Sequence, residues 1–249
     1  MNILLVFSYN GSKFYGYAKQ PNKRTVQEEV ESCLSRLFNT EIKINASGRT
    51  DAKVHAIRQY ANFHIEENQL KFDLENLKYR LNKMLPNDIY ILEAKEVENE
   101  FHARFAAILK VYEYKFTYKK YHDVFKNGLI SEINEQEKLD LNKLNEVKKL
   151  FIGTHSFRNF TSKVEDQNDF VRTIYDIKFI EHEDHSYSLI FEGSGFMMYQ
   201  VRMMVANIVM CAIGKISIEE IKKLIVQKER TITNYCYPPE GLYLVDVKY

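Results

Sequence analysis

The amino-acid sequence predicts an α+β fold of two ferredoxin-like halves, whose antiparallel sheets join into one with a cleft between the halves. Three observations support this fold class. The first hundred residues show strand and helix patterns in the order βαββαβ, which is a split βαβ arrangement. The second half repeats this order approximately. A chain of 249 residues is long for one compact core and suits two packed domains.

The first domain is expected to span residues 1–100 and to begin with a strand at 3–8. The segment Thr25-Val26-Gln27-Glu28 is typical of a capping box, in which Thr25 and Glu28 satisfy each other's free backbone amides. A helix with one apolar face follows, as far as Phe38. The other elements expected here are strands at 43–46, 59–65 and 89–93 and a helix at 74–83, with a turn at 86–88.

The second domain is expected to span residues 101–249. Alternating apolar residues predict strands, and helical periodicity predicts helices that cover them. The expected elements are a strand at 111–118, a helix at 141–151, a hairpin of strands 173–181 and 187–192, helices at 196–213 and 218–227, and a closing strand at 242–248. The polar stretch 119–138 is interpreted as an exposed insertion.

Composition limits the partners of this chain. The net charge is +1, so a polyanion would have to be bound by a local basic cleft. The three cysteines are far apart and show no metal-ligand spacing, which favours reduced thiols in a cytoplasmic protein without a metal. The N-terminus has a strand pattern and lacks the features of a signal peptide. The longest apolar stretch, 196–213, contains Gln200, Arg202 and Asn207, so a buried helix is favoured over a membrane span.

Asp51 is the first candidate functional residue. It lies in the segment Ser-Gly-Arg-Thr-Asp-Ala-Lys-Val-His-Ala at 47–56, directly before an expected strand. Gly48 permits a tight loop, and the cation of Arg49 favours an ionised carboxylate. Such a carboxylate can act as a nucleophile, a base or an ion-pair partner. The alternative is a turn aspartate or a helix cap, because aspartate is common at both.

Arg202 and Tyr112 are candidates from the second half. Arg202 interrupts an apolar helix pattern, where a buried guanidinium needs a carboxylate or phosphate, because breaking a buried pair costs about 3–5 kcal/mol. A structural ion pair or a side chain that reaches the surface is the alternative. Tyr112 and Tyr114 share one strand face, which could stack on a planar base or pack as ordinary tyrosines. Basic residues that could line a groove, or be separately solvated, are Lys19, Lys23, Arg24, Arg58, Lys110 and Lys115.

Several segments together resemble the bacterial tRNA pseudouridine synthase A family over essentially the full length of the chain. The matching segments occur in the family's order. They are Tyr9-Asn10-Gly11 with Phe14-Tyr15-Gly16, Arg24-Thr25-Val26-Gln27, Gly48-Arg49-Thr50-Asp51-Ala52 with Val54-His55-Ala56, Phe101-His102-Ala103-Arg104-Phe105, Tyr112-Glu113-Tyr114, Gly153-Thr154-His155 with Phe157, Val171-Arg172-Thr173-Ile174, Gly195-Phe196 with Val201-Arg202, and Pro238-Pro239-Glu240-Gly241-Leu242-Tyr243-Leu244.

The resemblance implies an RNA pseudouridine synthase that needs no cofactor. In that role Asp51 is the nucleophile that attacks a uridine at the ribose C1′ or the base C6, with Arg49 and Arg202 keeping it ionised and oriented. Tyr112 matches the tyrosine that stacks on the base. The other residues expected to bind substrate are Arg24, Lys53 and Arg58. The implied substrate is the anticodon stem-loop of tRNA, at tRNA positions 38 to 40. The implied assembly is a homodimer, without metal or membrane.

The chain departs from the family pattern around the expected site. Lys53 replaces a usual glycine, and Tyr17 replaces a usual tryptophan. Ala18-Lys19 and Met198-Tyr199-Gln200 also differ from the usual residues. If position 53 requires a positive φ, a lysine there costs about 1 kcal/mol or more. A divergent paralogue that modifies another RNA is therefore an alternative.

Two other functions would use part of the same set of residues. A glycoside hydrolase would also use Asp51 against an anomeric carbon, but retention needs a second carboxyl group about 5–5.5 Å away. The segment around Asp51 offers arginine instead of a second acid. A non-catalytic RNA-binding protein would need a basic cleft but not Asp51, so the presence of Asp51 with Arg49 and Arg202 argues against it.

Overall fold

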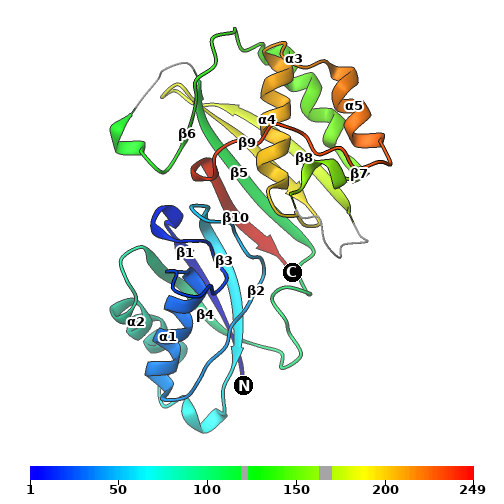
Figure 1. Ribbon diagram of the computed structural model, residues 1–249. Coiled ribbons are helices and arrows are strands. Elements are labelled where there is room, and N and C mark those ends of the chain that lie inside the picture. Colours follow the sequence, from blue (N-terminus) through cyan, green and yellow to red (C-terminus); the bar gives the residue numbers. More distant parts are fainter. Residues whose placement is uncertain (119–122, 163–169) are drawn as a thin grey trace. The chain divides into compact units, whose positions relative to one another are not determined.

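The computed structural model describes residues 1–118, 123–162 and 170–249 of the chain, drawn in Figure 1. These residues form two compact units, Met1–Ile108 with Tyr243–Tyr249, and Leu109–Leu242. Each unit combines a sheet with helices, so the α+β class is confirmed. The division differs from the predicted one in two places: residues 101–108 belong to the first unit, and so does nearly all of the last strand.

The sheet of the first unit is arranged around its first strand. Strand β1 (Asn2–Tyr9) pairs antiparallel with β3 (His55–His64) on one side and with β4 (Ile89–Val97) on the other. Strand β10 (Leu242–Lys248) pairs parallel with β3, which explains why the C-terminal residues belong to this unit. The short β2 (Asn45–Ala46) pairs antiparallel with β3.

Two helices cover this sheet, and they confirm the predicted βαββαβ order. They are α1 (Val26–Phe38) and α2 (Leu74–Met84), which lie together in Figure 1. Both are amphipathic, and α1 buries Val30 and Leu34 while α2 buries Leu77 and Leu81. The core they share with the sheet includes the fully buried side chains of β1. Short 3-10 helices occur at η1 (Gly11–Lys13) and η2 (Glu67–Gln69).

The predicted capping box at the start of α1 is wrong. Thr25 is the N-cap residue and has an extended backbone, but its side chain makes no capping hydrogen bond. Instead, the amide N–H of Val26 donates to the Gly16 carbonyl at 3.2 Å, and that of Gln27 donates to the Tyr17 carbonyl at 2.9 Å. The chain segment before the helix therefore supplies the acceptors that a capping side chain would otherwise provide.

The boundary between the units follows from two buried asparagines. The Asn2 side-chain amide donates to the carbonyls of Glu98 and Phe101, both at 2.9 Å. The Asn62 side chain donates to the Asn2 oxygen at 3.0 Å and accepts from the Ala103 amide at 2.9 Å. Both asparagines are fully buried, and their bonds attach the segment after β4 to the sheet of the first unit. The first unit therefore extends beyond residue 100.

The second unit contains a sheet in the order β5-β9-β8-β7. Its strands are β5 (Leu109–Tyr118), β7 (Gly153–Ser156), β8 (Val171–Glu181) and β9 (Ser186–Gly193), which pair antiparallel. Helices α3 (Leu141–Val147), α4 (Gln200–Ala212) and α5 (Ile218–Val226) lie together in Figure 1. Short 3-10 helices are η3 (Val124–Lys126), η4 (Lys148–Phe151), η5 (Arg158–Phe160) and η6 (Pro239–Gly241).

The stretch predicted as an exposed insertion contains a strand. Strand β6 (Ser131–Ile133) pairs parallel with β5, and its first and last side chains are buried. Ser131 accepts a hydrogen bond of 2.7 Å from the Tyr114 hydroxyl, which explains why a polar residue is buried there. The prediction is therefore wrong for this part of the stretch, and residues 119–122 lie outside the described residues.

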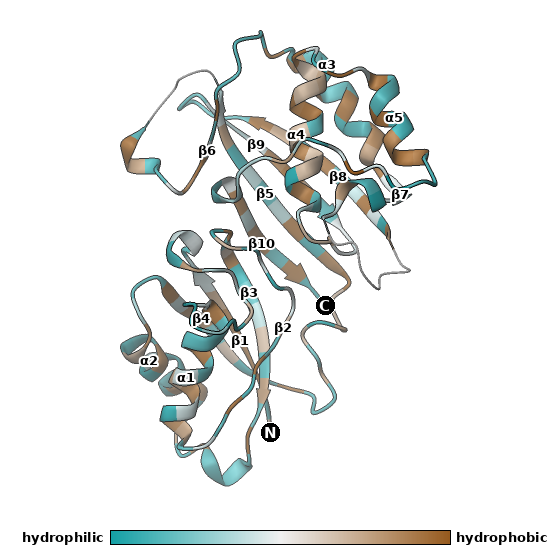
Figure 2. Cartoon of the chain, in the orientation of Figure 1, coloured by the Kyte–Doolittle hydropathy of each residue, from teal (hydrophilic) through white to brown (hydrophobic). Residues whose placement is uncertain are grey.

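Helix α4 forms the centre of the second unit. Every residue of this helix except Arg202 is buried, and the colours of Figure 2 show that most of its residues are hydrophobic. Its length of 13 residues is too short for a membrane span, and the same holds for every helix in the described ranges. The prediction of a buried core helix around Arg202 is thus confirmed.

Candidate active site

Asp51 lies in an irregular segment that connects β2 to β3. Strand β3 begins at His55 rather than at Gln59 as predicted, so the loop that carries Asp51 is short. Asp51 is half-buried, whereas Arg49 and Lys53 on either side of it are exposed. The loop therefore presents one carboxylate between two cations at the surface of the first unit.

Gln59 fixes the part of the loop that precedes Asp51. Its side-chain oxygen accepts from the Ser47 hydroxyl at 2.7 Å, and its side-chain amide donates to the Gly48 carbonyl at 3.0 Å. The Ser47 amide also donates to the Tyr60 carbonyl at 2.7 Å. Gln59 is fully buried on β3, so a rigid strand holds the loop two residues before Arg49.

Further hydrogen bonds fix the residues at Asp51 itself. The Thr50 carbonyl accepts from the Tyr17 amide at 3.0 Å, and the Thr50 hydroxyl lies 2.7 Å from the Tyr9 hydroxyl. The Asp51 carbonyl accepts from the Val54 amide at 3.2 Å, which closes a turn. Both the backbone and a side chain of the preceding residue are thus bonded to the scaffold, so the position of Asp51 is narrowly defined.

Two glycines allow the N-terminal segment to approach this loop. A Cβ on Gly11 would lie 2.0 Å from the Val54 carbonyl oxygen, a distance no side chain can adopt. Gly16 has a φ of +103°, and a Cβ there would lie 3.1 Å from the Thr50 carbonyl oxygen. The Gly11 amide also donates to the His55 Nδ1 at 3.0 Å. The glycines of both N-terminal motifs therefore serve backbone packing against the Asp51 loop.

Lys53 adopts the left-handed backbone conformation, with φ of 65°. Its amide donates to the Phe14 carbonyl at 3.2 Å, so this conformation is part of the hydrogen-bonded loop. Position 53 therefore has the positive φ that favours glycine, and the strain expected for a lysine at this position is present. Its side chain is exposed beside Asp51.

Arg24 forms ion pairs within the first unit. Its two terminal nitrogens donate to both carboxylate oxygens of Asp88 at 2.7 and 2.8 Å, and its Nε donates to Glu29 at 2.7 Å. The guanidinium also lies 4.2 Å from the centre of the Phe14 ring. Hydrogen bonds from Arg24 lower the pKa of Asp88. The residues Asn10, Lys13, Arg24, Pro86, Asn87 and Asp88 line a depression of about 400 Å³.

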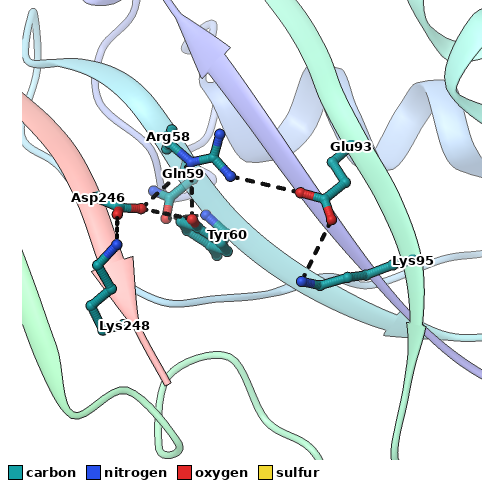
Figure 3. Close-up of polar contacts among 7 residues, drawn as sticks. All are labelled: Arg58, Gln59, Tyr60, Glu93, Lys95, Asp246 and Lys248. Carbon is teal, nitrogen blue, oxygen red and sulfur yellow. Dashed lines mark hydrogen bonds and ion pairs between the residues drawn. The ribbon is translucent and has the colours of Figure 1, made fainter.

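Arg58 also contacts acidic residues of its own unit, as Figure 3 shows. Its Nε donates to the Tyr60 hydroxyl at 3.0 Å, and that hydroxyl donates to Asp246 at 2.7 Å. The guanidinium lies 3.5 Å from Asp246 and 3.7 Å from Glu93. Arg24 and Arg58 are expected to bind substrate, and this role stays a prediction. In the structure both guanidiniums neutralise carboxylates of their own unit.

Tyr112 lies on β5 in the second unit. Only 9% of it is exposed, and its ring packs edge-on against Phe196 with centres 5.1 Å apart. Tyr114 is fully buried on the same strand, and its hydroxyl donates to Ser131 and to the Pro238 carbonyl at 2.8 Å. Glu113 between them accepts from the Ser188 hydroxyl at 2.7 Å. The alternation of the two tyrosines with Glu113 therefore agrees with the strand prediction.

Arg202 lies in the first turn of α4. Its Nε donates to the Tyr237 carbonyl at 2.6 Å, and its guanidinium lies 4.6 Å from the centre of the Tyr199 ring. Tyr199 is the N-cap residue of α4 and has a left-handed backbone, with φ of 63°. A carbonyl and an aromatic face thus orient the guanidinium within its unit.

The predicted site residues are divided between the two units. Arg49, Asp51 and Lys53 share one loop of the first unit. Arg24 and Arg58 belong to the same unit but lie outside this loop. Tyr112 and Arg202 belong to the second unit, so their meeting with Asp51 stays a prediction.

Sequence reasoning missed the supporting roles of Tyr9, Thr50 and Gln59. Their signal was indirect, because Tyr9 and Thr50 occur in matching segments and Gln59 is a polar residue inside a strand pattern. Among the described residues, no group of three potential metal ligands occurs.

The sequence of this chain is similar to one family of known proteins. Residues 5–106 and 147–249 match the sequence model of a family described as tRNA pseudouridine synthase. The tRNA pseudouridine synthase A of Staphylococcus aureus strain JH1 is 37% identical over 244 residues, covering 98% of this chain and 89% of that protein. The protein of strain Newman is 36% identical over the same shares. A chain in the crystal structure of a Cbf5-Nop10-Gar1 complex has 12% identity and a TM-score of 0.37, covering 84% of this chain and 53% of that one.

The family model and the Staphylococcus aureus relatives define the class of protein as an RNA-modifying isomerase. The chain belongs to the tRNA pseudouridine synthase family, since the family model and the identity to its relatives both extend over most of its length. It is therefore an enzyme that isomerises uridine in RNA, and the resemblance identified from the sequence is confirmed.

Proposed function

We propose that this enzyme converts uridine to pseudouridine in the anticodon stem-loop of tRNA and that Asp51 is its nucleophile. The observation that carries the proposal is the Asp51 loop. It is bonded to buried residues through Ser47 and Thr50 before Asp51 and through the Lys53 amide after it, while Asp51 itself is only half-buried. A loop with this support can place a carboxylate against a reacting atom without further rearrangement. The target base must leave its stack to reach such a carboxylate.

The proposed reaction rearranges bonds within one nucleotide. The Asp51 carboxylate attacks either the ribose C1′ or the base C6, and the bond from C1′ to N1 breaks. A bond from C1′ to C5 then forms, and the bond between Asp51 and the substrate breaks, which restores the free carboxylate. N1 gains a proton and C5 loses one, so the product is an isomer of the substrate. No oxidant or reductant is required, because the numbers of atoms and electrons do not change.

The roles of the other residues follow from their chemistry. Arg49 is exposed next to Asp51 and would keep the carboxylate ionised. We assign the same role to Arg202, the half-buried cation of α4, and base stacking to Tyr112. The exposed cations of Arg49 and Lys53 beside Asp51 provide a local positive charge for RNA phosphates, although the whole chain has a net charge of only +1. We further propose a cytoplasmic homodimer.

Substitution of Asp51 tests the proposal directly. Asp51→Ala and Asp51→Asn should fold and bind tRNA but form no pseudouridine, and only the wild type should form a covalent complex with fluorouridine-substituted tRNA. Glu75→Gln is a control for the loss of a carboxylate outside this loop, because Glu75 is exposed and pairs with Lys78 on the surface of α2. Turnover of Asp51→Ala near the wild-type rate would remove Asp51 from the role of nucleophile. Binding without turnover by the wild type would favour a non-catalytic RNA-binding protein, and turnover on another RNA only would indicate a divergent paralogue.

A further inference from the structure

We infer that Tyr9 is a positioning residue for Asp51 and acts through the side chain of Thr50. The inference rests on the proposed role of Asp51 as nucleophile. Tyr9 does not belong to the Asp51 loop, since it ends strand β1. It is connected to the loop by the contact of 2.7 Å between its hydroxyl and that of Thr50.

The surroundings of Tyr9 make its hydroxyl a fixed point. Only 4% of Tyr9 is exposed, and its backbone pairs with Ala56 on β3 and with Ile89 on β4. Its ring lies near those of Phe7 and Tyr17, with centres 6.3 and 6.5 Å away. A tyrosine restrained by two neighbouring strands and two rings has little freedom to follow a moving loop.

The hydroxyl of Tyr9 remains a hydrogen-bond donor under ordinary conditions. Burial raises the pKa of this hydroxyl, while hydrogen bonds to Thr50 and Gln59 act in the opposite direction. The protonated phenol can therefore donate to the Thr50 hydroxyl. Gln59 on β3 separately binds Ser47 and Gly48. Tyr9 and Gln59 thus contact both ends of the segment that leads to Asp51.

Thr50 transmits this restraint because it directly precedes Asp51. Only 8% of Thr50 is exposed, its carbonyl accepts from the Tyr17 amide, and its side chain contacts Tyr9. With both groups fixed, the peptide bond that joins Thr50 to Asp51 has a defined orientation. Loss of the Tyr9 contact would leave Thr50 attached through its carbonyl alone, and the Asp51 carboxylate would sample a wider range of positions.

A purely structural role for this contact predicts a different result. In that case loss of the buried hydroxyl contact would lower the stability of the first unit, and the folded fraction would react at the wild-type rate. The positioning role predicts a slower chemical step in enzyme that is fully folded and saturated with RNA. A displacement of about 1 Å can reduce a rate by about 100-fold, so a loss of about tenfold or more is expected.

The experiment compares single-turnover rates on saturating tRNA for Tyr9→Phe, Thr50→Val and the double variant, with tRNA affinity and thermal stability measured in parallel. Tyr9→Phe removes only the hydroxyl, Thr50→Val keeps the branched shape without the hydroxyl, and Thr50→Ser keeps the hydroxyl. Ile221→Val is the control for stability, because it shortens a fully buried side chain in the other unit. Asp51→Ala is included to test the nucleophile separately.

Support requires that both single variants slow the chemical step with unchanged tRNA affinity and that the double variant is no slower than the slower single one. Thr50→Ser and Ile221→Val should react at nearly the wild-type rate. Wild-type rates in Tyr9→Phe and Thr50→Val, with reduced thermal stability only, would overturn the inference. An equal loss of rate in Ile221→Val would also overturn it, since the rate would then follow stability. If Asp51→Ala remains active, the proposed function fails, and this result is distinct from the other outcomes.

Discussion

The backbone amide of Lys53 donates to the Phe14 carbonyl at 3.2 Å while Lys53 itself has a φ of 65°. The N-terminal segment therefore holds a lysine in a conformation that favours glycine, two residues after the proposed nucleophile. The side chain that causes this strain is exposed. A contact of this side chain with RNA phosphate stays a prediction.

Replacement of Lys53 separates strain from charge. Lys53→Gly and Lys53→Asn both suit a positive φ and both remove the cation, so both should weaken tRNA binding and flatten its dependence on salt. Relief of strain worth about 1 kcal/mol is partly offset by the greater freedom of glycine in the unfolded chain, so stability should change by less than about 1 kcal/mol. Binding titrations at several salt concentrations measure the effect, with Lys53→Arg as the control that keeps the charge. Unchanged affinity and salt slope in both variants would exclude the phosphate contact.

Arg202→Met should abolish turnover or slow it severely while the protein remains folded. Methionine suits the apolar surroundings of α4, so the helix should persist. The lost hydrogen bond to the Tyr237 carbonyl should lower stability by about 1 kcal/mol, which is too little to unfold the protein. Pseudouridine formation and circular dichroism measured on the same preparation test this. Activity near the wild-type level with reduced stability would make Arg202 a structural residue only.

The ion pair of Arg24 and Asp88 should make stability depend on acid pH. The pKa of Asp88 is lowered by its hydrogen bonds to Arg24, so the folded state favours the ionised carboxylate more than the unfolded state does. The pair therefore stabilises the fold fully above the ordinary aspartate pKa of about 3.9, and the contribution is lost as pH falls through the lower folded value. Asp88→Asn should be less stable than wild type at neutral pH, and this difference should shrink in acid.

Urea unfolding of wild type and Asp88→Asn at neutral pH and at about pH 3 measures this difference. The Arg24→Met variant is the matched control, because the Asp88 pKa in it should rise toward the ordinary value when followed by carboxylate NMR. A stability difference between wild type and Asp88→Asn that does not change with pH would show that the ion pair contributes nothing through ionisation.

The order of elements in the first unit could be predicted because its strands and helices have clear periodicity. The pattern of apolar residues in β1, α1, β2, β3, α2 and β4 is local information, and it was sufficient for the βαββαβ order. The pairing of β10 with β3 could not be predicted, because it joins residues from opposite ends of the chain. The capping of α1 by the Gly16 and Tyr17 carbonyls was missed for a different reason, since a sequence signature of a capping box says nothing about competing backbone acceptors.

The candidate site shows the same division between local and distant information. Asp51, Arg49 and Lys53 could be recognised because they are adjacent in sequence, and the positive φ of Lys53 could be anticipated from the glycine it replaces. The bonds of Tyr9 and Gln59 to this loop depend on the register of β1 and β3, which the sequence does not define residue by residue. The burial of Ser131 on β6 was missed because a polar stretch resembles a surface loop unless its buried partner is known.

Tyr17→Phe should make the protein more stable. Only 1% of Tyr17 is exposed, and its hydroxyl has no hydrogen-bond partner in the described part of the chain. A buried hydroxyl without a partner costs about 1–3 kcal/mol, so its removal should raise the free energy of unfolding by about 1 kcal/mol or more and the melting temperature by about 2–4 °C. Tyr114→Phe is the matched control, because the hydroxyl of this fully buried tyrosine donates to Ser131 and to Pro238. That variant should be less stable than wild type. Calorimetry measures the melting temperature of both variants. A lower melting temperature for Tyr17→Phe than for wild type would mean that the Tyr17 hydroxyl has a hydrogen-bond partner in solution.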